Sequence, residues 1–282
     1  MVQIDELFRY DDRRVVVTGC ASGIGAALSR QLAKLGAEVV GLDLSSPAQD
    51  SGVAEFHTLD LADEGSVADA VGAVAGPVHA LFNVAGVSSG IKNPLRVVTI
   101  NFLGTRRFTE AITPLMPPGS AIANVSSLAA SQYLANAPVT LGLLETESFA
   151  DGIRWCEANP DALADGGYRL SKEAIILYGM RYVAALGRKG IRINCSAPGV
   201  TDTPILDQLR SAYGQGFLDA FSNPLGRHAD ADEQASVLAF LNSAAARHIT
   251  GHVVWVDGGS VAERVFEDLT DRVHQQQAKD AT

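Results

Sequence analysis

Short runs of apolar, mostly β-branched residues alternate along the chain with longer segments in which apolar positions recur at helical spacing. Each short run is continuously apolar rather than alternating between apolar and polar positions. This pattern predicts strands that are buried on both faces of a sheet. The seven expected strands cover residues 14–19, 38–43, 53–60, 78–86, 120–127, 190–199 and 252–259.

The first helical segment, residues 24–36, has apolar side chains at a period near 3.6 and ends at Gly36, a typical helix C-cap. Strands that alternate with helices form parallel βαβ units with right-handed crossovers. The pattern therefore predicts an α/β fold with a doubly wound, seven-stranded parallel sheet and helices on both faces. Because no linker interrupts residues 1–282, we expect a single domain.

One long segment departs from this rhythm after the fifth expected strand. About forty residues, 128–167, precede the next helix, where a short loop is typical. Within them, residues 144–158 show a helical pattern whose apolar face includes Phe149, Ile153 and Cys156. Loops at the carboxyl ends of parallel strands build ligand sites. We therefore favour a wall of the substrate pocket over a decorative insertion for 128–167.

Two later segments each allow two interpretations. Residues 204–222 fit either a mobile lid over an apolar substrate or an amphipathic helix packed on the core. Their apolar side chains are Ile205, Leu206, Leu209, Tyr213, Phe217 and Phe221. The C-terminal tail, 260–282, fits either a frayed helix or a helix packed across a subunit interface. Its apolar side chains are Val261, Val265, Phe266, Leu269 and Val273.

Composition narrows the class of function. The chain has 282 residues, of which 47% are hydrophobic, and a net charge of −10. Nucleic acid and anionic membranes are not expected partners, because both need a basic surface. The first residues lack the features of a signal peptide, and the most apolar window, 71–87, is too interrupted to span a bilayer. Cys20, Cys156 and Cys195 lie far apart without metal-ligand spacing, so we expect a reduced, cytoplasmic protein with no metal.

A glycine-rich octet, TGCASGIG at residues 18–25, lies between the first strand and the first helix. Gly19 permits the sharp turn, and Gly23 lets the backbone approach a diphosphate closely. Gly25 permits close packing of the helix on the strand, and the first amides of the helix then point at the anion. The octet therefore predicts a dinucleotide-binding loop.

Asp43 ends the second expected strand, where it can select between two nucleotides. A carboxylate at this position accepts hydrogen bonds from both hydroxyls of an adenosine ribose and repels a 2′-phosphate. The neighbouring positions, Ser22 and Leu44, carry no cation that would offset the repulsion. The sequence therefore predicts NAD rather than NADP as the cofactor.

The stretch YRLSK places Tyr168 and Lys172 four positions apart in a predicted helix, so both lie on one face. Such a pair is typical of a solvated helix surface but also fits a proton-transfer site. A phenol titrates near ~10, so work near neutral pH requires its anion to be stabilised. The Lys172 ammonium and the cation of NAD⁺ are the natural sources of that stabilisation.

These motifs, in this order, resemble the short-chain dehydrogenase/reductase family over nearly the whole chain, and the resemblance implies a Rossmann fold. NVAG at 83–86 resembles the family's N-N-A-G, with Val84 in place of the second Asn. The other matching segments are 18–25, Asp60–Leu61, NFLG at 101–104, NVSS at 124–127, YRLSK at 168–172 and APGVTDT at 197–203.

The resemblance implies four catalytic residues. Tyr168 exchanges the proton, Lys172 supports it and donates to the nicotinamide ribose, Ser127 hydrogen-bonds the substrate carbonyl, and Asn101 holds a water that links Lys172 to solvent. The cofactor-binding residues implied by motif and resemblance together are Gly19, Ser22, Gly23, Ile24, Gly25, Asp43, Asp60, Leu61, Asn83, Ala85, Gly86, Tyr168, Lys172, Pro198, Gly199, Val200 and Thr203.

Ser127 and Tyr168 are 41 positions apart, which resembles the bacterial 3α-hydroxysteroid dehydrogenase/carbonyl reductase and coniferyl alcohol dehydrogenase subgroup. This implies a small-molecule secondary alcohol or ketone as substrate, hydrophobic and cyclic, and a homodimer or homotetramer. The insertion can block one usual subunit interface, which favours the dimer. A 3-oxoacyl-type reductase, an epimerase or dehydratase using bound NAD⁺, and a non-catalytic NAD-binding sensor or scaffold stay open as alternatives.

Overall fold

The computed structural model describes residues 3–219, 221 and 223–280. Seven parallel strands form one sheet in the order β3-β2-β1-β4-β5-β6-β7, which confirms the predicted fold class. The chain steps outward from β1 to β3, then crosses back to β4 and continues to β7. The strands are β1 (Arg14–Thr18), β2 (Glu38–Asp43), β3 (Glu55–Thr58), β4 (Ala80–Asn83), β5 (Ala121–Val125), β6 (Arg192–Pro198) and β7 (Val253–Val256).

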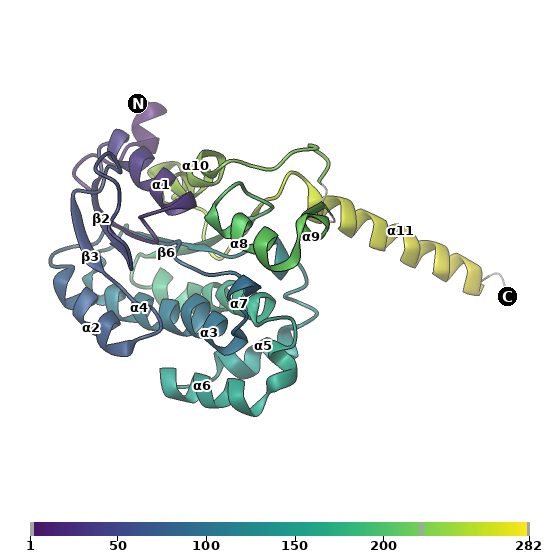
Figure 1. The fold of residues 1–282 in the computed structure, drawn as a ribbon. Coiled ribbons are helices and arrows are strands. Elements are labelled where there is room, and N and C mark those ends of the chain that lie inside the picture. Colours follow the sequence, from purple (N-terminus) through teal and green to yellow (C-terminus); the bar gives the residue numbers. More distant parts are fainter. Residues whose placement is uncertain (1–2, 220, 222, 281–282) are drawn as a thin grey trace.

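Helices cover both faces of this sheet (Figure 1). Helices α1 and α10 pack on one face, and α2, α4 and α7 pack on the other. The helices are α1 (Gly23–Lys34), α2 (Glu64–Ala73), α3 (Pro94–Val98), α4 (Thr105–Ile112), α5 (Ala137–Leu144), α6 (Phe149–Ala158), α7 (Tyr168–Gly187), α8 (Pro204–Tyr213), α9 (Gln215–Asp219), α10 (Ala231–Asn242) and α11 (Ser260–Asp280).

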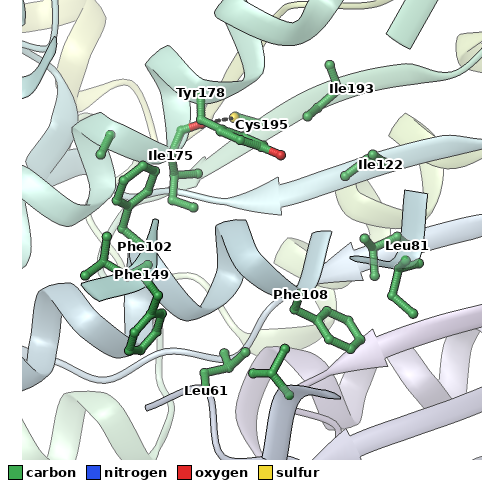
Figure 2. Packing of buried hydrophobic residues seen from close by; sticks show 14 of the residues in the cluster. Leu61, Leu81, Phe102, Phe108, Ile122, Phe149, Ile175, Tyr178, Ile193 and Cys195 are labelled. Carbon is green, nitrogen blue, oxygen red and sulfur yellow. Dashed lines mark hydrogen bonds between the residues drawn. The ribbon is translucent and has the colours of Figure 1, made fainter. Parts of the chain in front are cut away.

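The continuous apolar runs are explained by burial on both faces. Val15 and Val17 of β1 contribute to the core under α1 and α10, whereas Val16 contributes to the opposite core. Figure 2 shows this opposite core, which contains Val16. In it, Phe108 of α4 and Ile175 of α7 pack over β4 and β5. Strands β3 and β7 are only partly buried, because each lies at an edge with one neighbour.

The chain between α3 and α4 forms a wide, π-helical turn, η3 (Thr99–Gly104), so that α3, η3 and α4 run on as one interrupted helix. Gly104 ends this turn against the preceding loop: a Cβ there would lie 2.0 Å from the Leu61 carbonyl oxygen. Turns of this kind are frequent at functional sites. The turn brings Asn101 to a position that helical periodicity does not indicate.

The long insertion folds into η5 (Leu128–Ala130), α5, α6 and η6 (Pro160–Leu163). The expected helix within it is α6, which begins later than predicted because the Ser148 hydroxyl caps it by accepting from the Asp151 amide. Phe149, labelled in Figure 2, is buried in the core. Cys156 is buried there as well, and Ile153 packs against the same core. The middle of the insertion is therefore part of the folded body.

The C-terminal helix α11 extends away from the body (Figure 1). Four apolar side chains of the expected stripe are exposed on it: Val265, Phe266, Leu269 and Val273. The tail is thus helical through Asp280, and its packing across a subunit interface stays a prediction.

Candidate active site

A cleft of about 690 Å³ lies at the carboxyl edge of the sheet, where the strand order reverses between β1 and β4. Loops that follow four neighbouring strands line it, through Gly19 after β1, Ala85 after β4, Ser127 after β5 and Gly199 after β6. Ligands of doubly wound sheets bind at this crossing point. The cleft is therefore the candidate active site.

The glycine-rich loop is too tightly packed for side chains at two positions. Gly19 has a φ of +75°, and a Cβ there would lie 2.8 Å from the Ala85 Cα. A Cβ on Gly25 would lie 2.0 Å from the Gly19 carbonyl oxygen. Ser22 precedes α1 but its side chain makes no capping bond, so the first amides of α1 have no side-chain partner there. Bare backbone and uncapped amides fit a diphosphate.

Asp43 lies at one end of the cleft and is held there by backbone. Its Oδ2 accepts a 3.0 Å hydrogen bond from the Ala21 amide, and its Oδ1 accepts a 3.1 Å bond from the Ser45 amide. Leu44 beside it is 63% exposed and brings no charge. Asp60 lines the same end, where its Oδ1 accepts from the Ala62 amide.

Most of the predicted cofactor residues line this cleft, but Asn83 does not. Its Nδ2 donates to Asn124 Oδ1 at 2.7 Å and to Thr109 Oγ1 at 2.8 Å, and the side chain is buried beneath the cleft. Asn83 therefore ties β4 to β5 and α4. The predicted residues that do line the cleft are Gly19, Ser22, Gly23, Ile24, Gly25, Asp43, Asp60, Leu61, Ala85, Gly86, Ser127, Tyr168, Lys172, Pro198, Gly199, Val200 and Thr203.

Tyr168 and Lys172 open α7 at the other end of the cleft, opposite Ser127. The Lys172 Nζ lies 5.7 Å from the centroid of the Tyr168 ring and donates a 3.0 Å hydrogen bond to the Val125 carbonyl. Ser126 fixes the same helix turn, because its hydroxyl donates to the Lys172 carbonyl at 2.8 Å. The structure thus brings together the three side chains that the sequence placed on two distant segments.

Burial shifts the pKa values of Tyr168 and Lys172 in opposite directions, each toward the neutral form of the group. Burial raises the pKa of Tyr168, and a hydrogen bond with Ser127 acts in the opposite direction. Burial lowers the pKa of Lys172 to about 8. Burial disfavours the charged form of each group. The lowering of the phenol pKa expected from Lys172 together with the cation of NAD⁺ stays a prediction. The raised pKa favours the neutral phenol of Tyr168, the form that donates a proton.

Asn101 lies behind the cleft rather than in its lining. Its Oδ1 accepts from the Val87 amide at 2.8 Å, while its Nδ2 donates to the Val87 carbonyl at 2.9 Å and to Ser171 Oγ at 3.2 Å. A Cβ on Gly86 would lie 3.1 Å from Asn101 Oδ1 and 3.4 Å from Lys172 Nζ. Asn101 therefore fixes the loop after β4 next to Lys172, and the water relay expected of it stays a prediction.

Sequence reasoning missed a buried carboxylate, Glu173, next to Lys172 on α7. It is fully buried and accepts from Asn136 Nδ2 at 2.6 Å, Thr140 Oγ1 at 3.1 Å and Arg169 Nη1 at 3.2 Å. Asn136 and Thr140 belong to the insertion, so Glu173 joins the insertion to the catalytic helix. The sequence offered no clear signal of this role, because Glu173 directly follows Lys172 in a stretch that also contains Arg169 and Ser171.

We expect Glu173→Ala to lower the free energy of unfolding by about 2–4 kcal/mol, because it leaves Arg169, Asn136 and Thr140 without their buried acceptor. Urea unfolding monitored by circular dichroism measures this. Glu157→Ala, at an exposed position of α6, is the matched control and should change stability by less than about 0.5 kcal/mol. Equal unfolding midpoints for the two variants would contradict the assignment.

Four of the six apolar residues expected in segment 204–222 line the cleft. These are Ile205, Leu206, Leu209 and Phe221. Tyr213 does not line it, and its hydroxyl donates to the Ser89 carbonyl at 3.1 Å. The side chain of Phe217 and residues 220 and 222 lie outside the described part of the chain. Whether the segment moves as a lid stays a prediction.

The insertion contributes its two ends to the cleft, while its middle packs in the core. Leu128, Ala129, Ser131 and Gln132 follow Ser127 along one wall, and Asp165 stands just before Tyr168. Arg264, from the start of α11, also lines the cleft, and neither motif nor periodicity indicated it.

A dinucleotide-binding cleft that also holds a half-buried tyrosine and a buried lysine defines a nicotinamide-dependent oxidoreductase. Comparison with known proteins agrees with this class. Residues 13–139 match the short chain dehydrogenase family model, and residues 162–261 match a model described as enoyl-(acyl carrier protein) reductase. The chain belongs to the short-chain dehydrogenase/reductase family.

Three similar proteins support this assignment. The chain is 34% identical to a coniferyl-alcohol dehydrogenase of Pseudomonas sp., over 88% of this chain and 96% of that one. It is 32% identical to a 3-alpha-hydroxysteroid dehydrogenase/carbonyl reductase of Comamonas testosteroni, over 87% and 95%. It resembles the crystal structure of a 3-alpha-hydroxysteroid dehydrogenase from Pseudomonas sp. B-0831 complexed with NADH, with a TM-score of 0.78, 31% identity and coverage of 89% and 98%.

Two further features of the described residues concern metals and membranes. Among them, no group of three or more His, Cys, Asp or Glu side chains is arranged to hold a metal ion. No helix in the described ranges has the length and apolar character needed to cross a membrane. Cys20, Cys156 and Cys195 are buried, free thiols.

Proposed function

We propose that this protein is an NAD(H)-dependent dehydrogenase that interconverts a secondary alcohol and a ketone, with a hydrophobic cyclic molecule as substrate. One observation carries the proposal: Ser127, Tyr168 and Lys172 share a cleft with Asp43 at its opposite end. The nucleotide specificity follows from Asp43, whose carboxylate suits two ribose hydroxyls and repels a 2′-phosphate. NADH supplies the hydride when it is bound.

The chain's own residues manage the proton and the substrate oxygen. In reduction, Tyr168 donates its phenolic proton to the carbonyl oxygen, which becomes the product hydroxyl; in oxidation it takes that proton back. Ser127 hydrogen-bonds the same oxygen and stabilises the negative charge that develops there. Lys172 donates to the nicotinamide ribose and returns protons to Tyr168, and Asn101 holds the water that connects Lys172 to solvent.

The substrate class is supported by the cleft lining and by the relatives. Apolar residues of α8 and α9 and of the following loop line the same cleft as the reacting residues, namely Ile205, Leu206, Leu209, Leu218 and Phe221. The similar proteins include enzymes named for coniferyl alcohol and for a 3-alpha-hydroxysteroid. Such a wall suits a ring system better than a small, hydrated diol.

A dehydrogenase screen tests the proposed function. The protein is incubated with NAD⁺ and with steroids, terpenoid alcohols, aromatic alcohols or small diols, and the NADH absorbance band is followed. We expect turnover with cyclic apolar alcohols and much weaker turnover with diols. NADH binding without turnover of any alcohol or ketone would instead favour a non-catalytic sensor.

The pKa of Lys172 predicts a pH dependence. Below pH 8 Lys172 is an ammonium, and above it the group loses the proton and charge that assist Tyr168. We expect kcat/KM for ketone reduction to be level below pH 8 and to fall by about tenfold per pH unit above it. Burial raises the pKa of Tyr168, so the fall above pH 8 is assigned to Lys172.

The Lys172→Arg variant tests whether Lys172 causes the fall of kcat/KM above pH 8, because a guanidinium keeps its proton above pH 12. In this variant kcat/KM should no longer fall above pH 8, whatever its absolute rate. The same fall in both proteins, or a level native profile to pH 10, would contradict the assignment to Lys172.

We also propose that the protein forms a homodimer or homotetramer. The exposed apolar stripe of α11 supports this, because side chains such as Phe266, 71% exposed, are more stable when covered. Light scattering of the native chain should give about two or four times the protomer mass of 29.6 kDa. The Phe266→Glu/Leu269→Glu variant should reduce that mass if α11 contributes to the interface; an unchanged oligomer would place the interface elsewhere.

A further inference from the structure

Three cations line the cleft, namely Arg169, Lys172 and Arg264, and they differ in the partners that they already have. Arg169, next to Tyr168, is already neutralised: its Nε pairs with Asp165 Oδ2 at 2.8 Å and its Nη1 with Glu173 Oε2 at 3.2 Å. Lys172 is buried and donates to the Val125 carbonyl. Neither cation is therefore available to bind a charged group on a substrate.

Arg264 differs from both. Its Nε donates a 3.2 Å hydrogen bond to the Ser260 carbonyl, one helical turn earlier, and within the described part of the chain it makes no ion pair. Its side chain lines the cleft together with Leu218 and Phe221. Arg264 is itself exposed, so its two Nη groups remain accessible to a ligand beside these apolar side chains.

The backbone that carries Arg264 is fixed although the rest of α11 projects from the body (Figure 1). Asp257 is 8% exposed and accepts from the Gly259 amide at 3.0 Å and from the Val261 amide at 2.7 Å. The Ser260 hydroxyl donates to the Asp257 carbonyl at 3.1 Å. The first turn of α11 is therefore anchored at the end of β7, and it holds Arg264 at the cleft.

We propose that Arg264 binds a carboxylate of the substrate, at the end of the molecule remote from the reacting carbon. The inference rests on the proposed function and narrows its substrate class to cyclic hydroxy acids and keto acids. A guanidinium binds a carboxylate through two parallel hydrogen bonds. A local cation is needed for such a substrate, because the net charge of −10 disfavours anions over the protein as a whole.

Two ketones that differ in one charge test this. Reduction of 4-oxocyclohexanecarboxylate and of its ethyl ester by NADH is followed in the native protein, in Arg264→Met and in Arg272→Met. Arg272 lies on the same helix but does not line the cleft, so it is the matched control for loss of one cation. NADH affinity is measured for each protein by fluorescence titration.

We expect the native protein to prefer the acid, and Arg264→Met to lower the ratio of kcat/KM for acid over ester by about 10- to 100-fold. Arg272→Met should leave that ratio unchanged, and NADH affinity should be the same in all three proteins. A fall in NADH affinity with equal loss on both ketones would assign Arg264 to the cofactor and overturn the proposal.

The failure of this inference is distinguishable from failure of the proposed function. Turnover of neutral cyclic alcohols or ketones without preference for the acid overturns the role of Arg264 and leaves the proposed function intact. Absence of NAD-linked turnover with acids and neutral compounds alike overturns both.

Discussion

Tyr168→Phe should lower kcat for ketone reduction by about 100- to 10,000-fold while NADH affinity stays within about twofold. The substitution removes only the hydroxyl, so the substrate oxygen loses its proton donor while the ring still fills its place beside Lys172. Steady-state kinetics give kcat, and quenching of protein fluorescence by NADH gives the affinity.

The matched control is Tyr182→Phe on the same helix. The Tyr182 ring packs against Tyr178, with 4.7 Å between ring centroids, and does not line the cleft. The Tyr182→Phe variant should therefore keep the native kcat. A Tyr168→Phe protein that keeps its kcat would remove Tyr168 from the chemistry, and the other site assignments would have to be reconsidered with it.

The second large effect concerns nucleotide choice. Asp43→Ser combined with Leu44→Arg should lower kcat/KM with NAD⁺ by about 10- to 100-fold and reverse the preference toward NADP⁺. The double change removes the carboxylate that repels a 2′-phosphate and places a guanidinium beside it, where Leu44 is exposed. Asp43→Ala alone should erode the preference without reversing it.

Asp43 also holds the Ala21 and Ser45 amides, so a stability readout is needed beside the kinetics. Thermal unfolding of each variant shows whether the loop survives, and only variants that unfold near the native temperature are compared. Asp50→Ala removes one exposed acid from the same loop and should leave selectivity unchanged. Native NAD⁺/NADP⁺ selectivity in a folded Asp43→Ala protein would refute the assignment.

The sheet, the glycine-rich loop and the Tyr–Lys pair could be predicted because each has a local cause. A strand buried on both faces must be apolar at successive positions, as Val15, Val16 and Val17 are. A loop that approaches a neighbouring backbone as closely as Gly19 and Gly25 do excludes Cβ atoms. Such constraints act on single positions or on neighbours in the chain, so they are visible in the sequence.

Strand and helix ends were less predictable. The fourth expected strand, 78–86, is shorter in the structure because the residues after Asn83 turn away to line the cleft. Thr18 causes part of this turn, since its hydroxyl accepts from the amides of both Val84 and Ala85 at 3.1 Å. The partner of those amides comes from a strand far away in the sequence.

The sequence by itself therefore determined the fold class, the dinucleotide loop and the residue types at the reacting centre. The tertiary structure alone decided that Asn83 points into the core, that Glu173 joins the insertion to α7, and that Arg264 reaches the cleft. It also decided the direction of the Tyr168 pKa, because burial depends on every segment packed around the phenol. The physical reason is the same in each case: these properties are set by contacts between residues distant in the chain, which no local pattern records.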